Sequence, residues 1–84
     1  MKPVVVYTTD YCGYCVAAKS LLKAKGILFQ EIDVTKDQEL RQEVVRRSGR
    51  RTVPQIFIGD EPIGGFTELR ALDVSGDLEE KLAD

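Results

Sequence analysis

Residues 7–22 read YTTDYCGYCVAAKSLL, and both cysteines of this 84-residue chain lie within this stretch. The β-branched, apolar residues just before and at its start predict a short buried strand over residues 3–8. From Cys15 onward apolar residues recur at helical spacing, which predicts a helix that ends at Gly26. If this helix begins near Cys12, that cysteine lies at its N-terminus and Cys15 lies one turn inside.

The spacing of Cys12 and Cys15 limits the chemistry that they can serve. A disulfide between residues three apart closes a small loop and constrains the unfolded chain little. A structural zinc site needs about four ligands, whereas this chain offers two cysteines and no histidine. The absence of histidine also excludes a cysteine–histidine nucleophile pair. The spacing therefore favours a redox-active pair over two inert cysteines.

The helix N-terminus is expected to make Cys12 the more reactive thiol. Unpaired backbone N–H groups and the helix dipole stabilise negative charge there, which lowers the pKa of a thiol from its ordinary value of about 8.5. Cys15 is expected on the face toward the core, as the weaker thiol. From there it is positioned to attack a mixed disulfide formed on Cys12.

The rest of the chain predicts strands and helices in alternation. A strand is expected over residues 27–34, a helix over 35–49, a hairpin over 53–65 that turns at 59–62, and a last helix over 67–82 broken at Gly76. The resulting order is β-α-β-α-β-β-α. It favours an α/β fold in which a right-handed crossover joins two parallel strands and the hairpin is antiparallel.

Length and composition indicate one small domain over residues 1–84. The chain is 43% hydrophobic and 31% charged, and its net charge of −2 gives no indication of a nucleic-acid or membrane-surface partner. The apolar run Val4–Val6 is too short for a signal-peptide core, and no segment has the length of a membrane span. The reducing cytoplasm is therefore the expected compartment.

Three motifs in order resemble those of the glutaredoxins: CGYC at 12–15, TVP at 52–54, and GG at 64–65 before the last helix. The resemblance runs from Val4 to Leu82. It implies a thioredoxin fold, with a four-stranded mixed sheet flanked by helices. It also implies an enzyme that uses glutathione to reduce protein disulfides and protein–glutathione mixed disulfides, with Cys12 as the nucleophile and Cys15 as the resolving thiol.

The resemblance further implies a glutathione site beside the cysteines. Pro54 is expected in cis, and the backbone of Val53 is expected to pair with the cysteinyl part of glutathione. Glycine at residue 65 lets the backbone approach a ligand, and the N–H groups at the start of the last helix suit the γ-glutamyl carboxylate. Arg51 is expected to meet the glycine carboxylate. The full set assigned to glutathione is Tyr14, Arg51, Thr52, Val53, Pro54, Gly65, Phe66 and Thr67.

Two departures from the family pattern lie beside Cys12. Many glutaredoxins carry lysine where this chain has Thr9, and the following Asp10 would raise the pKa of the Cys12 thiol if its carboxylate pointed toward the sulfur. Glycine replaces the proline that the commonest dithiol glutaredoxins have at position 13. Some glutaredoxins with glycine or serine there hold a [2Fe–2S] cluster between two protomers, which implies Cys12 as a ligand in a dimer and no metal site in the monomer.

Two other functions therefore stay open beside the reductase, which is expected to act mainly as a monomer. One is a dimeric carrier of a glutathione-ligated [2Fe–2S] cluster. The other is a thioredoxin-like electron donor that does not use glutathione. The arginines between residues 41 and 51 form the one local excess of charge, and the dipole at a helix C-terminus or the choice of partners would each account for them.

Overall fold

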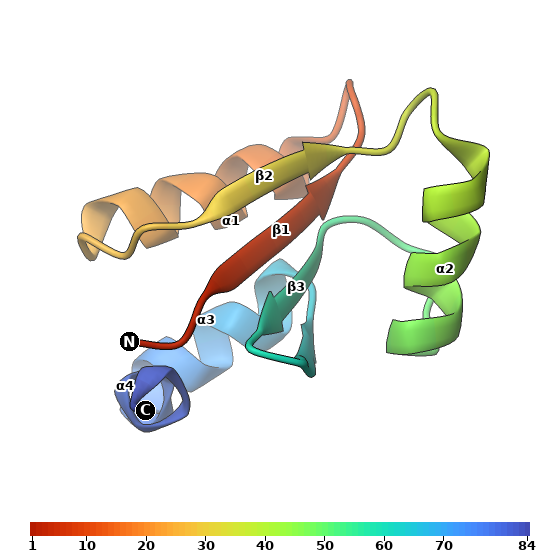
Figure 1. Ribbon diagram of the computed structural model, residues 1–84. Coiled ribbons are helices and arrows are strands. Elements are labelled where there is room, and N and C mark those ends of the chain that lie inside the picture. The colour runs from red at the N-terminus through yellow and green to blue at the C-terminus, as the bar shows by residue number, and fades with distance from the viewer.

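The computed structural model describes residues 1–84 as a four-stranded mixed sheet with helices on both faces (Figure 1). The strands are β1 Val4–Thr8, β2 Gln30–Asp33, β3 Gln55–Ile58 and β4 Glu61–Gly64, in the spatial order β2-β1-β3-β4. Strand β1 pairs in parallel with β2 and antiparallel with β3, and β3 pairs antiparallel with β4. The predicted thioredoxin fold is confirmed.

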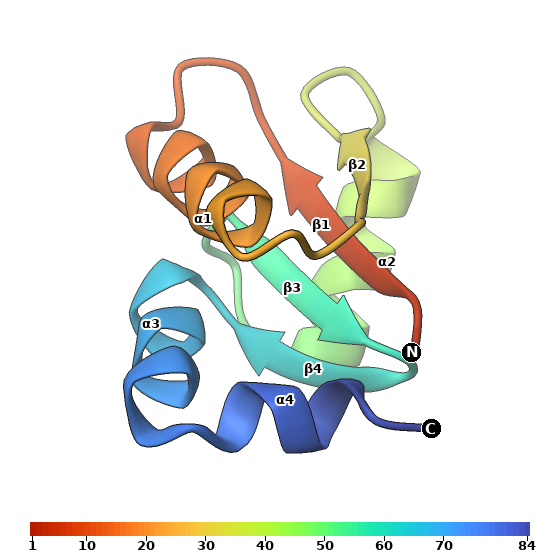
Figure 2. The same cartoon turned by 90° about the vertical axis from the view of Figure 1, so that its left-hand side faces the viewer.

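Four helices cover the sheet unequally. They are α1 Gly13–Ala24, α2 Gln38–Ser48, α3 Phe66–Ser75 and α4 Asp77–Leu82. Figure 2 shows α1, α3 and α4 on one side of the sheet, with α2 behind it. Gly76, in the left-handed conformation, separates α3 from α4 as the sequence predicted. None of the four helices has both the length and the apolar character needed to cross a bilayer.

The alternation of side chains along the strands divides the core into two clusters. Val4 and Val6 of β1 point toward α1, α3 and α4, where ten buried residues form the larger cluster. Tyr7 points to the opposite face and packs with Phe57 and Val44 of α2 in a cluster of four buried residues. This period of two is the expected consequence of the pleated backbone. Helix α1, whose first turn carries the cysteines, is therefore packed into the larger of the two clusters.

Three predicted boundaries are wrong: the start of β2, the start of α2 and the extent of the hairpin turn. The strand predicted over residues 27–34 begins only at Gln30, because the N–H of Ile27 still bonds to the carbonyl of Leu22 as α1 ends. The helix predicted over residues 35–49 begins at Gln38, because the Asp37 carboxylate accepts a hydrogen bond from Leu40 N–H at 3.0 Å and caps the helix there.

The hairpin turn is shorter than predicted. It occupies residues 59 and 60 alone, so Glu61 and Pro62 belong to β4 instead of the turn. Strand β4 lies at the edge of the sheet, where proline is tolerated because one side of the strand has no ladder partner.

Candidate active site

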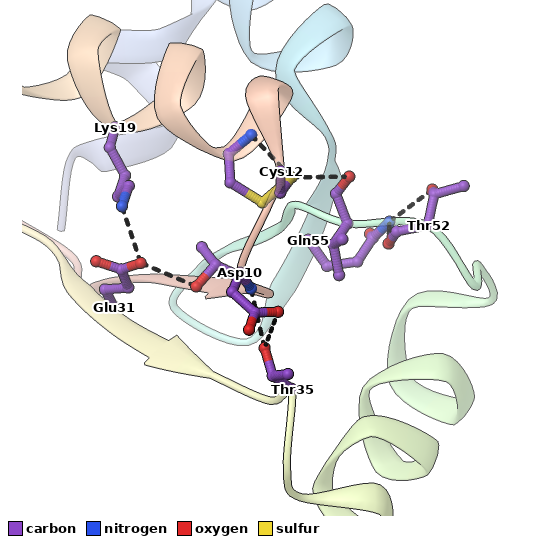
Figure 3. The surroundings of a disulfide bond; sticks show 10 residues. Asp10, Cys12, Lys19, Glu31, Thr35, Thr52 and Gln55 are labelled. Carbon is purple, nitrogen blue, oxygen red and sulfur yellow. Dashed lines mark hydrogen bonds and ion pairs between the residues drawn. A yellow bond between two sulfur atoms is a disulfide. The ribbon is translucent and has the colours of Figure 1, made fainter.

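The cysteine pair occupies the first turn of α1. Cys12 is the N-cap residue and Cys15 lies one turn inside, and the two are joined by a disulfide with their Cα atoms 5.2 Å apart (Figure 3). Cys15 is 2% exposed, whereas Cys12 is only partly buried. The backbone N–H of Cys15 donates to the Cys12 sulfur at 3.1 Å. This N–H is in place to stabilise a Cys12 thiolate once the disulfide is reduced.

The loop that precedes the pair turns its acidic residue away from the sulfur. The Asp10 N–H donates to the Thr35 hydroxyl at 2.9 Å, and this hydroxyl donates to the Asp10 carboxylate at 3.1 Å. Figure 3 shows Asp10 directed toward Thr35, at the end of β2. The carboxylate is therefore engaged with the loop after β2 instead of pointing at Cys12.

The loop before β3 approaches the pair from the other side. Its Val53–Pro54 peptide is cis, as the resemblance implied, and the Val53 carbonyl oxygen lies 3.8 Å from the Cys12 sulfur. The Gln55 amide nitrogen donates to the Thr52 carbonyl at 2.7 Å and to the Thr52 hydroxyl at 3.3 Å. Because Gln55 is 1% exposed and belongs to β3, it ties this loop to the sheet.

A cleft of about 240 Å³ opens between this loop and the start of α3. The rings of Tyr14 and Phe66 stack across it with centroids 6.3 Å apart. The residues that line the cleft are Tyr14, Arg50, Thr52, Val53, Pro54, Gly65, Phe66, Thr67 and Glu68. Seven of the eight residues assigned to glutathione by resemblance thus converge on one cleft next to Cys12.

The eighth, Arg51, lines a separate hollow beside α2. Its neighbour Arg50 reaches the cleft and pairs with Glu68 at 2.9 Å. The Glu68 carboxylate also accepts a hydrogen bond from the Gly65 N–H at 2.7 Å, and this bond, with the Arg50 guanidinium, lowers the pKa of Glu68. A Cβ added at Gly64 would come within 2.8 Å of both the Arg50 and the Glu68 side chains.

Sequence reasoning missed three residues of this site. Glu68 follows Gly65 by three positions, which is the spacing of a capping box and could have been noticed. Gln55 is the one polar residue of the strand QIFI, and it too was a readable signal. No local pattern distinguishes Arg50 from Arg51, since they are adjacent and chemically identical.

The glutaredoxin family model matches residues 4–63. The chain belongs to the glutaredoxin family. It is 49% identical over 83 residues to a glutaredoxin of Pseudomonas aeruginosa, covering 99% of each chain. Among solved structures, the buckwheat glutaredoxin–glutathione complex is 32% identical with a TM-score of 0.88, over 96% of this chain and 76% of that one. A structure described as "Metal Binding of Glutaredoxins" is 49% identical with a TM-score of 0.76, over 98% and 89%.

Family and site together identify the chemistry in its general form. A glutaredoxin whose Cys12 and Cys15 lie at a helix N-terminus is a thiol–disulfide oxidoreductase. The disulfide between them is the oxidised form of the redox-active pair.

Proposed function

We propose that this glutaredoxin reduces protein–glutathione mixed disulfides and protein disulfides, with glutathione as the electron donor. The observation that carries the proposal is the cleft beside Cys12, lined by seven residues that the family resemblance assigns to glutathione. The buckwheat relative of the same fold was solved as a glutathione complex, which supports the same ligand here. Residues 1–84 are proposed to work as one domain in the cytoplasm, mainly as a monomer.

Reduction of a mixed disulfide needs only Cys12. Its thiolate attacks the glutathione sulfur, the bond from that sulfur to the substrate breaks, and the substrate leaves as a thiol after taking up a proton. A second glutathione thiolate then attacks the glutathione sulfur held on Cys12. Glutathione disulfide leaves and the Cys12 thiolate is restored, with the Cys15 N–H at 3.1 Å available to stabilise it.

Reduction of a protein disulfide also needs Cys15. The Cys12 thiolate attacks one sulfur of the substrate and forms a mixed disulfide with it, while the substrate S–S bond breaks and the other sulfur takes up a proton and becomes the first free thiol. The buried Cys15 then attacks the Cys12 sulfur, which releases the second substrate thiol and leaves the Cys12–Cys15 disulfide. Two glutathione molecules reduce this disulfide and leave as glutathione disulfide.

Backbone groups are proposed to orient the ligand. The Val53 peptide group pairs with the cysteinyl backbone of glutathione, beside the Cys12 sulfur. The N–H groups of Phe66 and Thr67 begin the ten-residue helix α3 and suit the γ-glutamyl carboxylate. Arg51 is proposed to bind the glycine carboxylate because no acidic side chain lies within ion-pair distance of it, whereas Arg50 is held by Glu68.

Turnover with defined reductants tests this function. The protein is assayed on a small glutathione mixed disulfide and on a protein disulfide. It is supplied either with glutathione, glutathione reductase and NADPH, or with thioredoxin reductase and NADPH alone. We expect turnover of both substrates that saturates with glutathione, and none with thioredoxin reductase. Glutathione-independent reduction of the protein disulfide would establish the thioredoxin-like alternative instead.

A second candidate function rests on Gly13. A Cβ at this position would meet no atom within 4 Å, so Gly13 borders open space next to Cys12 in the chain. No three His, Cys, Asp or Glu side chains converge to hold a metal ion, and Cys15 is buried, so one chain cannot supply the four thiolates of a [2Fe–2S] cluster. Two Cys12 thiolates and two glutathiones would supply them. The 49%-identical relative studied for metal binding favours keeping this candidate.

Anaerobic reconstitution with iron, sulfide and glutathione tests the cluster. The expected product is a brown dimer that forms only with glutathione and is inactive as a reductase while loaded. Gly13→Pro is expected to abolish it without loss of reductase turnover, because the ring restricts the approach to Cys12. A colourless monomer from the unmodified protein would eliminate this function.

A further inference from the structure

Three arginines without ion-pair partners line one hollow beside α2. Arg41, Arg46 and Arg51 surround it together with Gln38, Gln42 and Val45, and its volume is about 590 Å³. The protein has six ion pairs within 4.0 Å, and none of them includes any of these three guanidinium groups. We call this feature the arginine hollow.

The helix dipole does not account for the arginine hollow. It favours Arg46, which lies in the last turn of α2, but Arg41 lies three residues after Gln38, near the end where a cation is disfavoured. Arg51 lies beyond the helix, after the left-handed Gly49. The helix dipole therefore explains the position of only one of the three arginines in the hollow.

The arginine hollow adjoins the redox cleft. Arg51 lines the hollow, while the next two residues, Thr52 and Val53, line the cleft and bring the Val53 carbonyl to the Cys12 sulfur. A polypeptide whose modified cysteine meets Cys12 could therefore extend across the hollow. The chain as a whole has a net charge of −2, so the positive charge is local to this surface and does not make the protein a general binder of polyanions.

We propose that Arg41 and Arg46 of the arginine hollow dock an acidic segment of the protein substrate, next to the cysteine whose disulfide is reduced, while Arg51 binds glutathione. Guanidinium groups bind carboxylates through paired N–H donors, and those without an ion-pair partner can do so without first breaking such a contact within the protein. This docking rests on the proposed glutathione-dependent reductase function and adds its class of substrate. It predicts a salt-sensitive preference among protein substrates and no effect on substrates too small to reach α2.

Two glutathionylated peptides of equal length test the docking. In one the cysteine is flanked by aspartate and glutamate, and in the other by asparagine and glutamine. The variants are Arg46→Glu, outside the proposed glutathione site, and Lys23→Glu as a control with the same change of charge. Lys23 is exposed and lies near the far end of α1, about 15 Å along the helix from the first turn. A small glutathione mixed disulfide reports the basal activity.

The unmodified protein is expected to have a several-fold higher kcat/KM for the acidic peptide at low salt, and this preference should vanish at about 0.5 M salt. Arg46→Glu should lower kcat/KM for the acidic peptide about fivefold and leave the neutral peptide and the small substrate unchanged. Lys23→Glu should leave all three unchanged.

Equal kcat/KM for the two peptides, or an equal loss in both variants, would overturn the docking while the reductase function stands. A lack of glutathione-dependent turnover on every substrate would overturn the reductase function, and the docking with it.

Discussion

The two sides of the cleft are built from different kinds of groups. On the α1 side the reactive atoms are side-chain sulfurs, held by a helix that packs into the larger core cluster. On the opposite side the atom nearest the Cys12 sulfur belongs to the backbone, at the carbonyl of Val53 before the cis peptide, and the cleft also includes Gly65, which has no side chain. The α1 side should therefore be sensitive to side-chain replacement, and the opposite side to changes that move the backbone or its supports.

The largest effect is expected from the cysteines themselves. Cys12→Ser should abolish turnover on glutathione mixed disulfides because serine does not form a comparable nucleophile at neutral pH. Cys15→Ser should keep much of that turnover but lose reduction of protein disulfides, since the buried thiol only resolves the mixed disulfide. Steady-state assays on both substrates provide the check. Equal losses in the two variants on the mixed disulfide would contradict the one-cysteine step.

The backbone side is tested by Gly64→Ala with Gly76→Ala as its matched control. Both glycines have positive φ, 111° at Gly64 and 84° at Gly76, so both substitutions introduce backbone strain. Only at Gly64 would the new Cβ also approach Arg50 and Glu68 within 2.8 Å, whereas at Gly76 it meets nothing within 4 Å. We therefore expect a several-fold higher KM for glutathione in Gly64→Ala alone. An equal KM in the two variants would show that the Arg50–Glu68 contact does not contribute to glutathione binding.

The two adjacent arginines are distinguished by single alanine variants. Arg51→Ala should raise the KM for glutathione about tenfold, because a charge-assisted hydrogen bond contributes about 1.5–3 kcal/mol before screening by solvent. Arg50→Ala should raise it less and instead loosen the start of α3, since its guanidinium is held by Glu68. Glutathione titrations and unfolding curves measure both effects. A larger increase of KM in Arg50→Ala than in Arg51→Ala would show that Arg50 binds the glycine carboxylate of glutathione.

The smallest effect is expected at Thr9. A lysine here would place a positive charge near the start of α1 and lower the pKa of the Cys12 thiol. The pH at which iodoacetamide alkylates Cys12 at half its maximal rate should therefore fall in Thr9→Lys relative to the unmodified protein and to Thr9→Val. An unchanged midpoint would mean that the N–H groups at the helix start set the thiol pKa without help from residue 9.

Most of the fold could be predicted because single residues decide local structure. Gly76 breaks the last helix and Gly49 ends α2, both in the left-handed conformation that glycine adopts most readily. The predicted boundaries are wrong where a contact or a place in the sheet, and not the identity of one residue, decides the structure. The start of β2 depends on the bond from Ile27 to Leu22, and Pro62 is tolerated in β4 only because that strand lies at the sheet edge.

The segments that form the site could also be predicted, because each of them carries a short motif. The motifs at residues 12–15, 52–54 and 64–65 identify the segments that meet at the cleft, and the structure brings them together. The direction of each arginine after Gly49 depends on how the chain leaves α2, which no local pattern encodes. The amide of Gln55 holds Thr52 only once the loop has folded back on β3.

The proposed glutathione site is tested most directly by the amide NMR spectrum of Cys15→Ser, as the free thiol and as the Cys12–glutathione mixed disulfide. If glutathione lies in the cleft, the largest chemical-shift changes outside the first turn of α1 will fall on Val53, Phe66 and Thr67. These residues come from the two segments that line the cleft opposite the cysteines. Changes confined to residues 11–15 would show that glutathione is attached to Cys12 without being bound, and would contradict the proposed site.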